Sequence, residues 1–178
     1  MNAFPQWAVR EDKSAAAIVS VWVDPSGRIY DCKALQRIGD KRLADEICSL
    51  VLRRRIPGAV DHEGAAVTGN IVTLIKLTLP GTPVGDQIAR MTQPPDLTLE
   101  LNRLPQGLSS PYKLGLAVEV GVDGSTGACN GTLQANETLA HIACERLAAE
   151  TFEVALNKDG APVPYVRSLT AMILVDGH

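Results

Sequence analysis

Residues 15–36 carry the alternating pattern of a β-hairpin. Apolar side chains occupy every second position of the first run, at Ala17, Val19, Val21 and Val23. This period of two is typical of a strand with one buried face. Turn residues follow at 24–27 (Asp-Pro-Ser-Gly), and a second strand is predicted over 28–36. Residues 1–14 have only a weak pattern and are predicted to be an extended lead-in.

A helix and a third strand follow the hairpin. Asp40 offers a helix N-cap directly after Gly39, and four apolar residues then recur with helical spacing. These residues are Leu43, Ile47, Leu50 and Val51. Pro57-Gly58 ends the helix, and the run 67–79, rich in Val, Ile, Leu and Thr, is predicted to be a strand. The first half of the chain therefore has the predicted order strand, strand, helix, strand.

The second half of the chain repeats this order. Residues 19–32 align without a gap with residues 116–129, and after a one-residue deletion Cys48 aligns with Cys144. We interpret the match as an internal duplication of one small unit. The predicted elements of the second copy are strands over 113–122 and 125–133, a helix from Asn136 through Glu150, and a last strand over 163–175.

The predicted fold class is α+β, with two tandem units that each pack one helix on a small antiparallel sheet. The predicted division is unit 1 at 1–79, a linker rich in Pro and Gly at 80–95, and unit 2 at 96–178. The leucines at 97, 99 and 101 alternate with polar residues, which predicts a further short strand of unit 2. Units of this size bury little apolar surface, so a covalent cross-link in each would add useful stability.

The four cysteines fall as one pair in each predicted unit. Cys32 and Cys48 are 16 positions apart (48 − 32), and Cys129 and Cys144 are 15 apart (144 − 129). We predict a disulfide within each pair, worth about 3 kcal/mol in the chain-entropy model, and hence an oxidising compartment. The alternatives are buried free thiols and, less favoured, a metal shared by His141 and Cys144, because no zinc-type cysteine or histidine spacing occurs.

Charge and hydropathy argue against nucleic-acid and membrane-spanning roles. The formal net charge is −3, and the basic run Arg53-Arg54-Arg55 lies at the predicted end of a helix, so no nucleic-acid partner is expected. No apolar run approaches the roughly 18–20 residues of a membrane-spanning helix, and no signal-peptide pattern occurs. We therefore expect any export signal or anchor to lie outside this sequence.

The titratable residues give no indication of catalysis. His62 lies in a predicted turn, His141 on a predicted helix and His178 at the terminus. No Gly-x-Ser-x-Gly, His-Glu-x-x-His or phosphate-binding glycine loop occurs. We expect a non-enzymatic protein without a cofactor or metal. A pocket that holds His62 or His141 beside a carboxylate and a serine or cysteine would reverse that expectation.

Several short motifs in the first unit occur in an order that points to one family. They are Val-x-Val-Asp-Pro-Ser-Gly-Arg at 21–28, Asp31-Cys32, the helix residues Leu43-Ala44-Asp45 and Cys48, then Arg54-Arg55 and Asp61-x-x-Gly-x-x-Val. This order resembles the C-terminal domain of TonB-family energy transducers, in its cysteine-bearing variety. The resemblance covers 15–79 well and 113–175 more faintly, because the second copy lacks the arginines. It implies a helix on an antiparallel sheet, in the bacterial periplasm.

The resemblance also implies a mode of action. TonB C-terminal domains contact outer-membrane transporters by pairing an edge strand with a short extended peptide, which is β-augmentation. The strands at 67–79 and 163–174 are therefore the candidate contact strands. The candidate contact residues are Asn70, Ile71, Val72, Thr73, Leu74, Ile75, Lys76, Arg167, Ser168, Leu169, Thr170 and Ala171. The alternative is that these strands are core, or pair with each other in one sheet.

The sequence also departs from the family. It contains no inner-membrane anchor or long Pro/Lys-rich spacer, its charge is mildly acidic, and it carries a second copy. A duplicated protein-interaction module, with a TonB-dependent outer-membrane transporter as one possible partner, fits these departures better than a transducer of force. The alternative function is a structural or dimerisation scaffold of a larger envelope protein, forming a homodimer by edge-strand pairing. An enzyme is a distant third.

Overall fold

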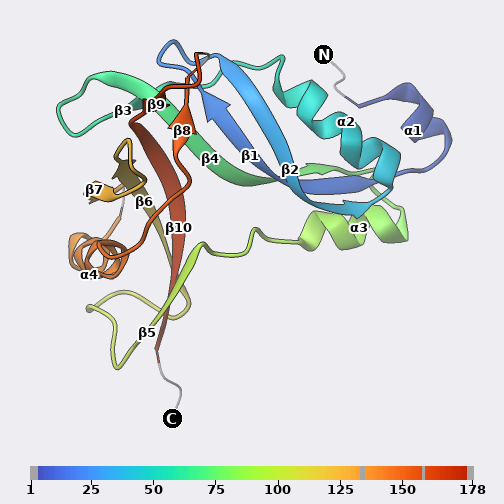
Figure 1. Cartoon of the computed structure of the whole chain (residues 1–178). Coiled ribbons are helices and arrows are strands. Elements are labelled where there is room, and N and C mark those ends of the chain that lie inside the picture. Colours follow the sequence, from blue (N-terminus) through green and yellow to red (C-terminus); the bar gives the residue numbers. More distant parts are fainter. Residues whose placement is uncertain (1–3, 133–134, 158, 176–178) are drawn as a thin grey trace. The chain divides into compact units, whose positions relative to one another are not determined.

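The chain has a mixed α+β fold with four short helices in the part that the structure describes (Figure 1). The computed structural model describes residues 4–132, 135–157 and 159–175. The predicted α+β class is confirmed, whereas the arrangement in two tandem copies of one unit stays a prediction. Leu133, Lys158 and His178, which fall in or beside predicted elements, lie outside the described residues. The chain divides into two compact units, Met1–Gly58 with Asn70–Gln93 and Ala59–Gly69 with Pro94–His178. From here on, unit 1 and unit 2 mean these two observed units and no longer the predicted ranges 1–79 and 96–178.

Unit 1 is built on three strands. β1 (Ala15–Val23) lies between β2 (Ile29–Gly39) and β4 (Ala66–Leu77), whose residues from Asn70 onward belong to this unit. β1 and β2 are antiparallel, with Val21 opposite Cys32. The predicted alternation is confirmed, because the apolar residues at 17, 19, 21 and 23 are all buried.

Three helices cover this sheet. α2 (Lys41–Val51) begins where the sequence predicts, since the Asp40 carboxylate accepts a hydrogen bond from the Leu43 N–H at 2.9 Å. α3 (Pro83–Arg90) lies within the segment predicted as linker, and Thr82 caps it by accepting from the Gly85 N–H at 3.1 Å. α1 (Gln6–Arg10) lies in the segment predicted to be extended, so that prediction is wrong for these residues. A helix of this length is too short to show a helical period in the sequence.

The helices pack on both faces of the unit 1 sheet. α2 lies on β1 and β2 (Figure 1) and buries Leu43, Ile47 and Val51. α1 packs beside α2, where the Trp7 indole N–H donates to Glu46 at 3.0 Å. At the start of β1 the three residues 15–17 are all fully buried. Because successive strand residues face opposite sides, a second layer must cover the other face, and α3 supplies it through contacts with β1 and β2.

The described residues of unit 2 form more strands than unit 1 has, and one helix. β6 (Tyr112–Val120) lies between β10 (Tyr165–Val175) and β7 (Thr126–Gly131), antiparallel to both. α4 (Glu137–Leu147) packs on β6 and β7 and ends earlier than predicted. The short strands are β3 (Ala59–Val60), β5 (Leu97–Leu101), β8 (Ala155–Leu156) and β9 (Pro162–Val163). β5 confirms the short strand that the alternating leucines predict.

Corresponding residues of the two halves make corresponding contacts. The Gly27 carbonyl accepts from the Ile56 N–H at 3.0 Å, and the Gly124 carbonyl accepts from the Phe152 N–H at 2.8 Å. Both glycines have positive φ, +81° and +83°. The cysteine pairs are also equivalent. Cys32 pairs with Cys48 and Cys129 with Cys144, with Cα atoms 5.4 and 5.6 Å apart, which confirms both predicted disulfides. All four thiols are thereby withdrawn from metal binding.

Candidate functional site

The first candidate contact strand is the second part of β4, and its seven predicted contact residues differ in their surroundings. Asn70 is only 1% exposed, and its side-chain amide donates to the Ser20 hydroxyl at 2.9 Å, so it serves the interior of unit 1. The following residues, 71–76, are half-buried. The Lys76 ammonium donates to the Ala89 carbonyl of α3 at 2.8 Å, which places the even-numbered residues on the α3 face.

A glutamine side chain forms hydrogen bonds with the backbone of β4. The Gln93 side-chain amide donates to the Val72 carbonyl at 2.7 Å and accepts from the Leu74 N–H at 3.1 Å. These are the backbone groups that a neighbouring strand would use, because residues two apart direct their N–H and C=O to the same side. We call the backbone groups of residues 72–76 on this side the β4 edge. At Val72 and Leu74 the hydrogen-bonding groups of this edge are satisfied by the Gln93 side chain.

An apolar groove lies beside the β4 edge. Ile75 and Leu77 point to the α2 face, where they line a groove of about 220 Å³ together with residues of α2 and its exit. The lining residues from α2 and its exit are Ile47, Leu50, Val51 and Arg54. Arg54 is the one charged residue among the lining residues, and it is exposed at the rim of an otherwise aliphatic groove. A strand added at the β4 edge would direct every second side chain to this face.

The second candidate contact strand, β10, is already paired along its predicted contact residues. Arg167 through Ala171 lie opposite Val118 through Leu114 of β6. On the other side, Thr170 donates its N–H to the Asp96 carboxylate and accepts the Asp96 N–H, each at 2.8 Å. From Ala171 onward β10 pairs in parallel with β5, which lies beside it in Figure 1. The chain itself therefore occupies the backbone groups of β10 from Thr170 to Val175.

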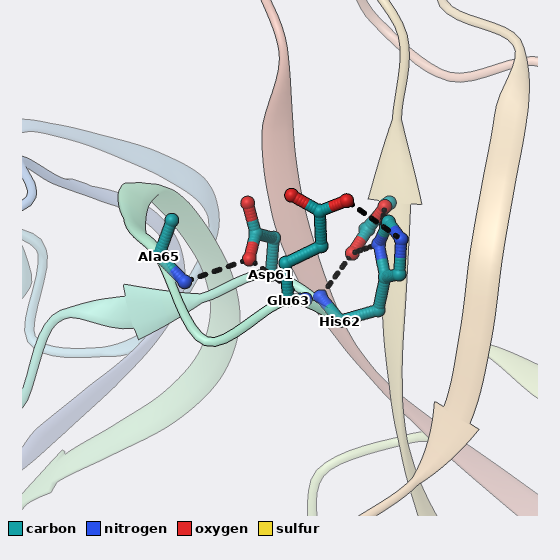
Figure 2. A network of polar contacts seen from close by, with 5 residues as sticks. Asp61, His62, Glu63 and Ala65 are labelled. Atoms are coloured by element: carbon teal, nitrogen blue, oxygen red, sulfur yellow. Dashed lines mark hydrogen bonds and ion pairs between the residues drawn. The ribbon is translucent and has the colours of Figure 1, made fainter.

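His62 lies in a polar network at the turn between β3 and β4 (Figure 2). The Asp61 carboxylate shapes the turn by accepting from the N–H groups of Glu63 and Ala65, at 3.0 and 2.8 Å. Glu119 of β6 accepts from the His62 backbone N–H at 2.6 Å, and its carboxylate lies 2.8 Å from the His62 Nδ1. This hydrogen bond, assisted by the charge of Glu119, raises the pKa of His62. The network fastens the turn to β6 within unit 2.

The described residues contain no group of three or more His, Cys, Asp or Glu side chains placed to hold a metal ion. The His141 ring lies 3.2 Å from Glu145 on the same exposed helix face. His141 also lines a cavity of about 540 Å³ with Glu137, Cys129 and Cys144, but both cysteines are joined in a disulfide and offer no thiol nucleophile. Among the described residues, no helix is both long enough and apolar enough to span a membrane.

Comparison with protein-family models, with curated proteins and with solved structures finds no match to this chain. The resemblance to TonB C-terminal domains therefore stays a prediction from the motifs.

Two residues of the candidate site are not predicted from the sequence. Gln93 and Asp96 lie in or beside the predicted linker, where no period in the pattern marks them. Their role depends on backbone groups of strands far away in the sequence, which a hydropathy pattern does not contain. A local signal exists only for the residues after Asp96, because the alternating leucines predict β5.

Proposed function

We propose that the chain is a non-enzymatic protein-interaction module of the bacterial envelope, built from two tandem TonB C-terminal-like units, which binds an extended peptide segment at the β4 edge. The observation that carries this proposal is the Gln93 amide on the Val72 and Leu74 backbone. A peptide backbone offers the same donor and acceptor, and repeats them along its length, so it satisfies this edge better than one amide does.

The groove supports the proposal from a second direction. Affinity in β-augmentation comes from main-chain hydrogen bonds, and selectivity comes from pockets for alternate side chains. The groove beside Ile75 and Leu77 lies on the face to which alternate side chains of an added strand would point. The β4 edge therefore has both parts of such a site.

The cellular location and the partner class rest on other observations. Two disulfides support an oxidising compartment, for which we propose the periplasm. The motif order shared with TonB C-terminal domains supports a TonB-dependent outer-membrane transporter as the source of the peptide. The extended segment that such a transporter presents to the periplasm is the ligand class we propose.

Titration of ¹⁵N-labelled protein with synthetic transporter-derived peptides tests the proposal. We expect amide shift changes at Val72, Leu74 and Lys76 that saturate with peptide concentration. Absence of any change along β4 or β10 at millimolar peptide would remove the peptide-binding function. Sedimentation at several protein concentrations is run in parallel, because a concentration-dependent dimer that involves the same amides would instead favour the scaffold function.

A further inference from the structure

The two candidate edges are occupied in different ways by the same short stretch of chain. Gln93 holds the β4 edge with one side-chain amide, whereas Asp96 and the five residues of β5 hold β10 with backbone and side chain together. We propose that Gln93 is an exchangeable occupant that an incoming strand displaces, so that the chain binds one peptide, at β4, while β5 keeps β10 closed. This inference rests on the proposed function.

Gln93 is suited to exchange because little holds it in place. Its side chain is half-buried, and its neighbours Thr92 and Pro94 are exposed. Its contact with β4 consists of two neutral hydrogen bonds. On exchange the Gln93 amide returns to water, while the Val72 and Leu74 backbone groups bond to the incoming strand. Two such bonds change a binding constant by about 5- to 100-fold. Displacement therefore lowers the affinity for a peptide without preventing binding.

β5 is held far more firmly than Gln93. Its five residues pair in register with Ala171 through Val175 of β10. The side chains of Leu97, Leu99 and Leu101 also pack against the buried core of unit 2. A peptide that competes for β10 would have to break this ladder and expose three leucines to water, which is unfavourable. The closed edge of unit 2 explains why a repeat of the fold does not imply a repeat of the binding site.

The surroundings of the β4 edge define the chemistry of the partner. A residue placed beside Ile75 points into the aliphatic groove, which fits a Leu, Ile or Val side chain. Arg54 lines the same groove, and Arg53 and Arg55 beside it are exposed, so a carboxylate on the partner is favoured there. The partner we propose is thus an extended peptide with aliphatic residues at alternate positions and an acidic residue next to one of them.

The chain itself supplies a suitable probe. Residues 95–103 (Pro-Asp-Leu-Thr-Leu-Glu-Leu-Asn-Arg) have alternate leucines and an acidic residue, and their β5 part already pairs with a strand. The acetylated, amidated peptide of this sequence is titrated into ¹⁵N-labelled wild type, Gln93→Ala and the matched control Gln87→Ala, whose glutamine is exposed on α3. A second peptide carries Leu99→Pro, which removes a ladder donor in its centre.

We expect Gln93→Ala to bind the probe about tenfold more tightly than wild type, with Gln87→Ala equal to wild type and one peptide per chain. The Gln93 side-chain amide of wild type should shift on binding, and the Leu99→Pro peptide should not bind. Equal affinity of wild type and Gln93→Ala, with shifts at residues 72–76, would overturn the exchange while leaving strand addition intact. Shifts centred on β10, or two peptides per chain, would overturn the closed edge. No binding by any variant at millimolar probe would overturn both the exchange and the proposed function.

Discussion

Replacing Gly27 by alanine tests the contact between the hairpin turn and the segment after the helix, a contact that occurs once in each half of the chain. Gly27 has φ +81°, and an added Cβ would collide with the backbone carbonyl oxygen of Ile56. The Gly27 carbonyl also accepts a hydrogen bond from the Ile56 N–H at 3.0 Å, so the hairpin turn and the segment after α2 are joined there. The substitution therefore strains the backbone of Gly27 and separates two elements at once.

The magnitude follows from three contributions. An alanine at positive φ costs about 1 kcal/mol. Relief of the collision requires a backbone shift, comparable to overpacking a core at about 1–3 kcal/mol. Loss of the hydrogen bond from Ile56 adds about 1 kcal/mol. We expect the free energy of unfolding of unit 1 to fall by about 4 kcal/mol. Gly81 has φ +80° and no atom within 4 Å of an added Cβ, so Gly81→Ala isolates the first contribution, about 1 kcal/mol.

Urea unfolding, followed by the fluorescence of Trp7 and Trp22 in unit 1, measures both variants. The midpoint of Gly27→Ala should fall several times further below that of wild type than the midpoint of Gly81→Ala, at equal slopes. Equal destabilisation of the two variants would refute the reasoning, because the collision with Ile56 would then contribute nothing.

Two further predictions concern the cross-links and the turn of Figure 2. Replacing Cys32 and Cys48 together by serine should lower the free energy of unfolding by about 3 kcal/mol, because the disulfide closes a loop of 16 residues, and dithiothreitol should then have little further effect on unit 1. No loss of stability in the double variant would contradict the pairing. The pKa of His62 is raised in the folded chain, so the contact with Glu119 stabilises the turn fully below the unfolded pKa of about 6.5 and is lost as the pH rises through the folded pKa. An NMR titration of the His62 ring should give a lower pKa in Glu119→Gln than in wild type, and identical values would remove Glu119 as the cause.

The sequence predicts the elements that local patterns specify. The alternation at 15–23 follows from a strand with one buried face, and the cap at Asp40 follows from side-chain chemistry three residues from its partner Leu43. The cysteine pairs are predictable because the alignment of residues 19–48 with 116–144 places one pair in each aligned segment. In each of these cases the residues that carry the signal lie within one element or recur at a fixed offset.

The organisation of the candidate site does not follow from local patterns. Whether a strand has an occupied edge depends on backbone groups, which are alike in nearly every residue. The sequence of the twelve candidate contact residues therefore does not indicate how the edges of β4 and β10 are occupied. Gln93 and Asp96 separate the two cases only through contacts with residues 19 to 74 positions away. The grouping of the hairpin 59–69 with unit 2 is likewise a long-range result, carried in part by His62 and Glu119.

Scalar coupling across hydrogen bonds tests the central claim most directly, because it identifies the acceptor bound to the Leu74 N–H. In the uncomplexed protein the Leu74 ¹⁵N should couple to the side-chain carbonyl ¹³C of Gln93, its acceptor at 3.1 Å. After saturation with a ¹³C-labelled extended peptide, we predict that this coupling disappears and that Leu74 couples to a backbone carbonyl of the peptide. A Leu74 coupling that stays with Gln93 in the saturated complex would contradict strand addition at the β4 edge.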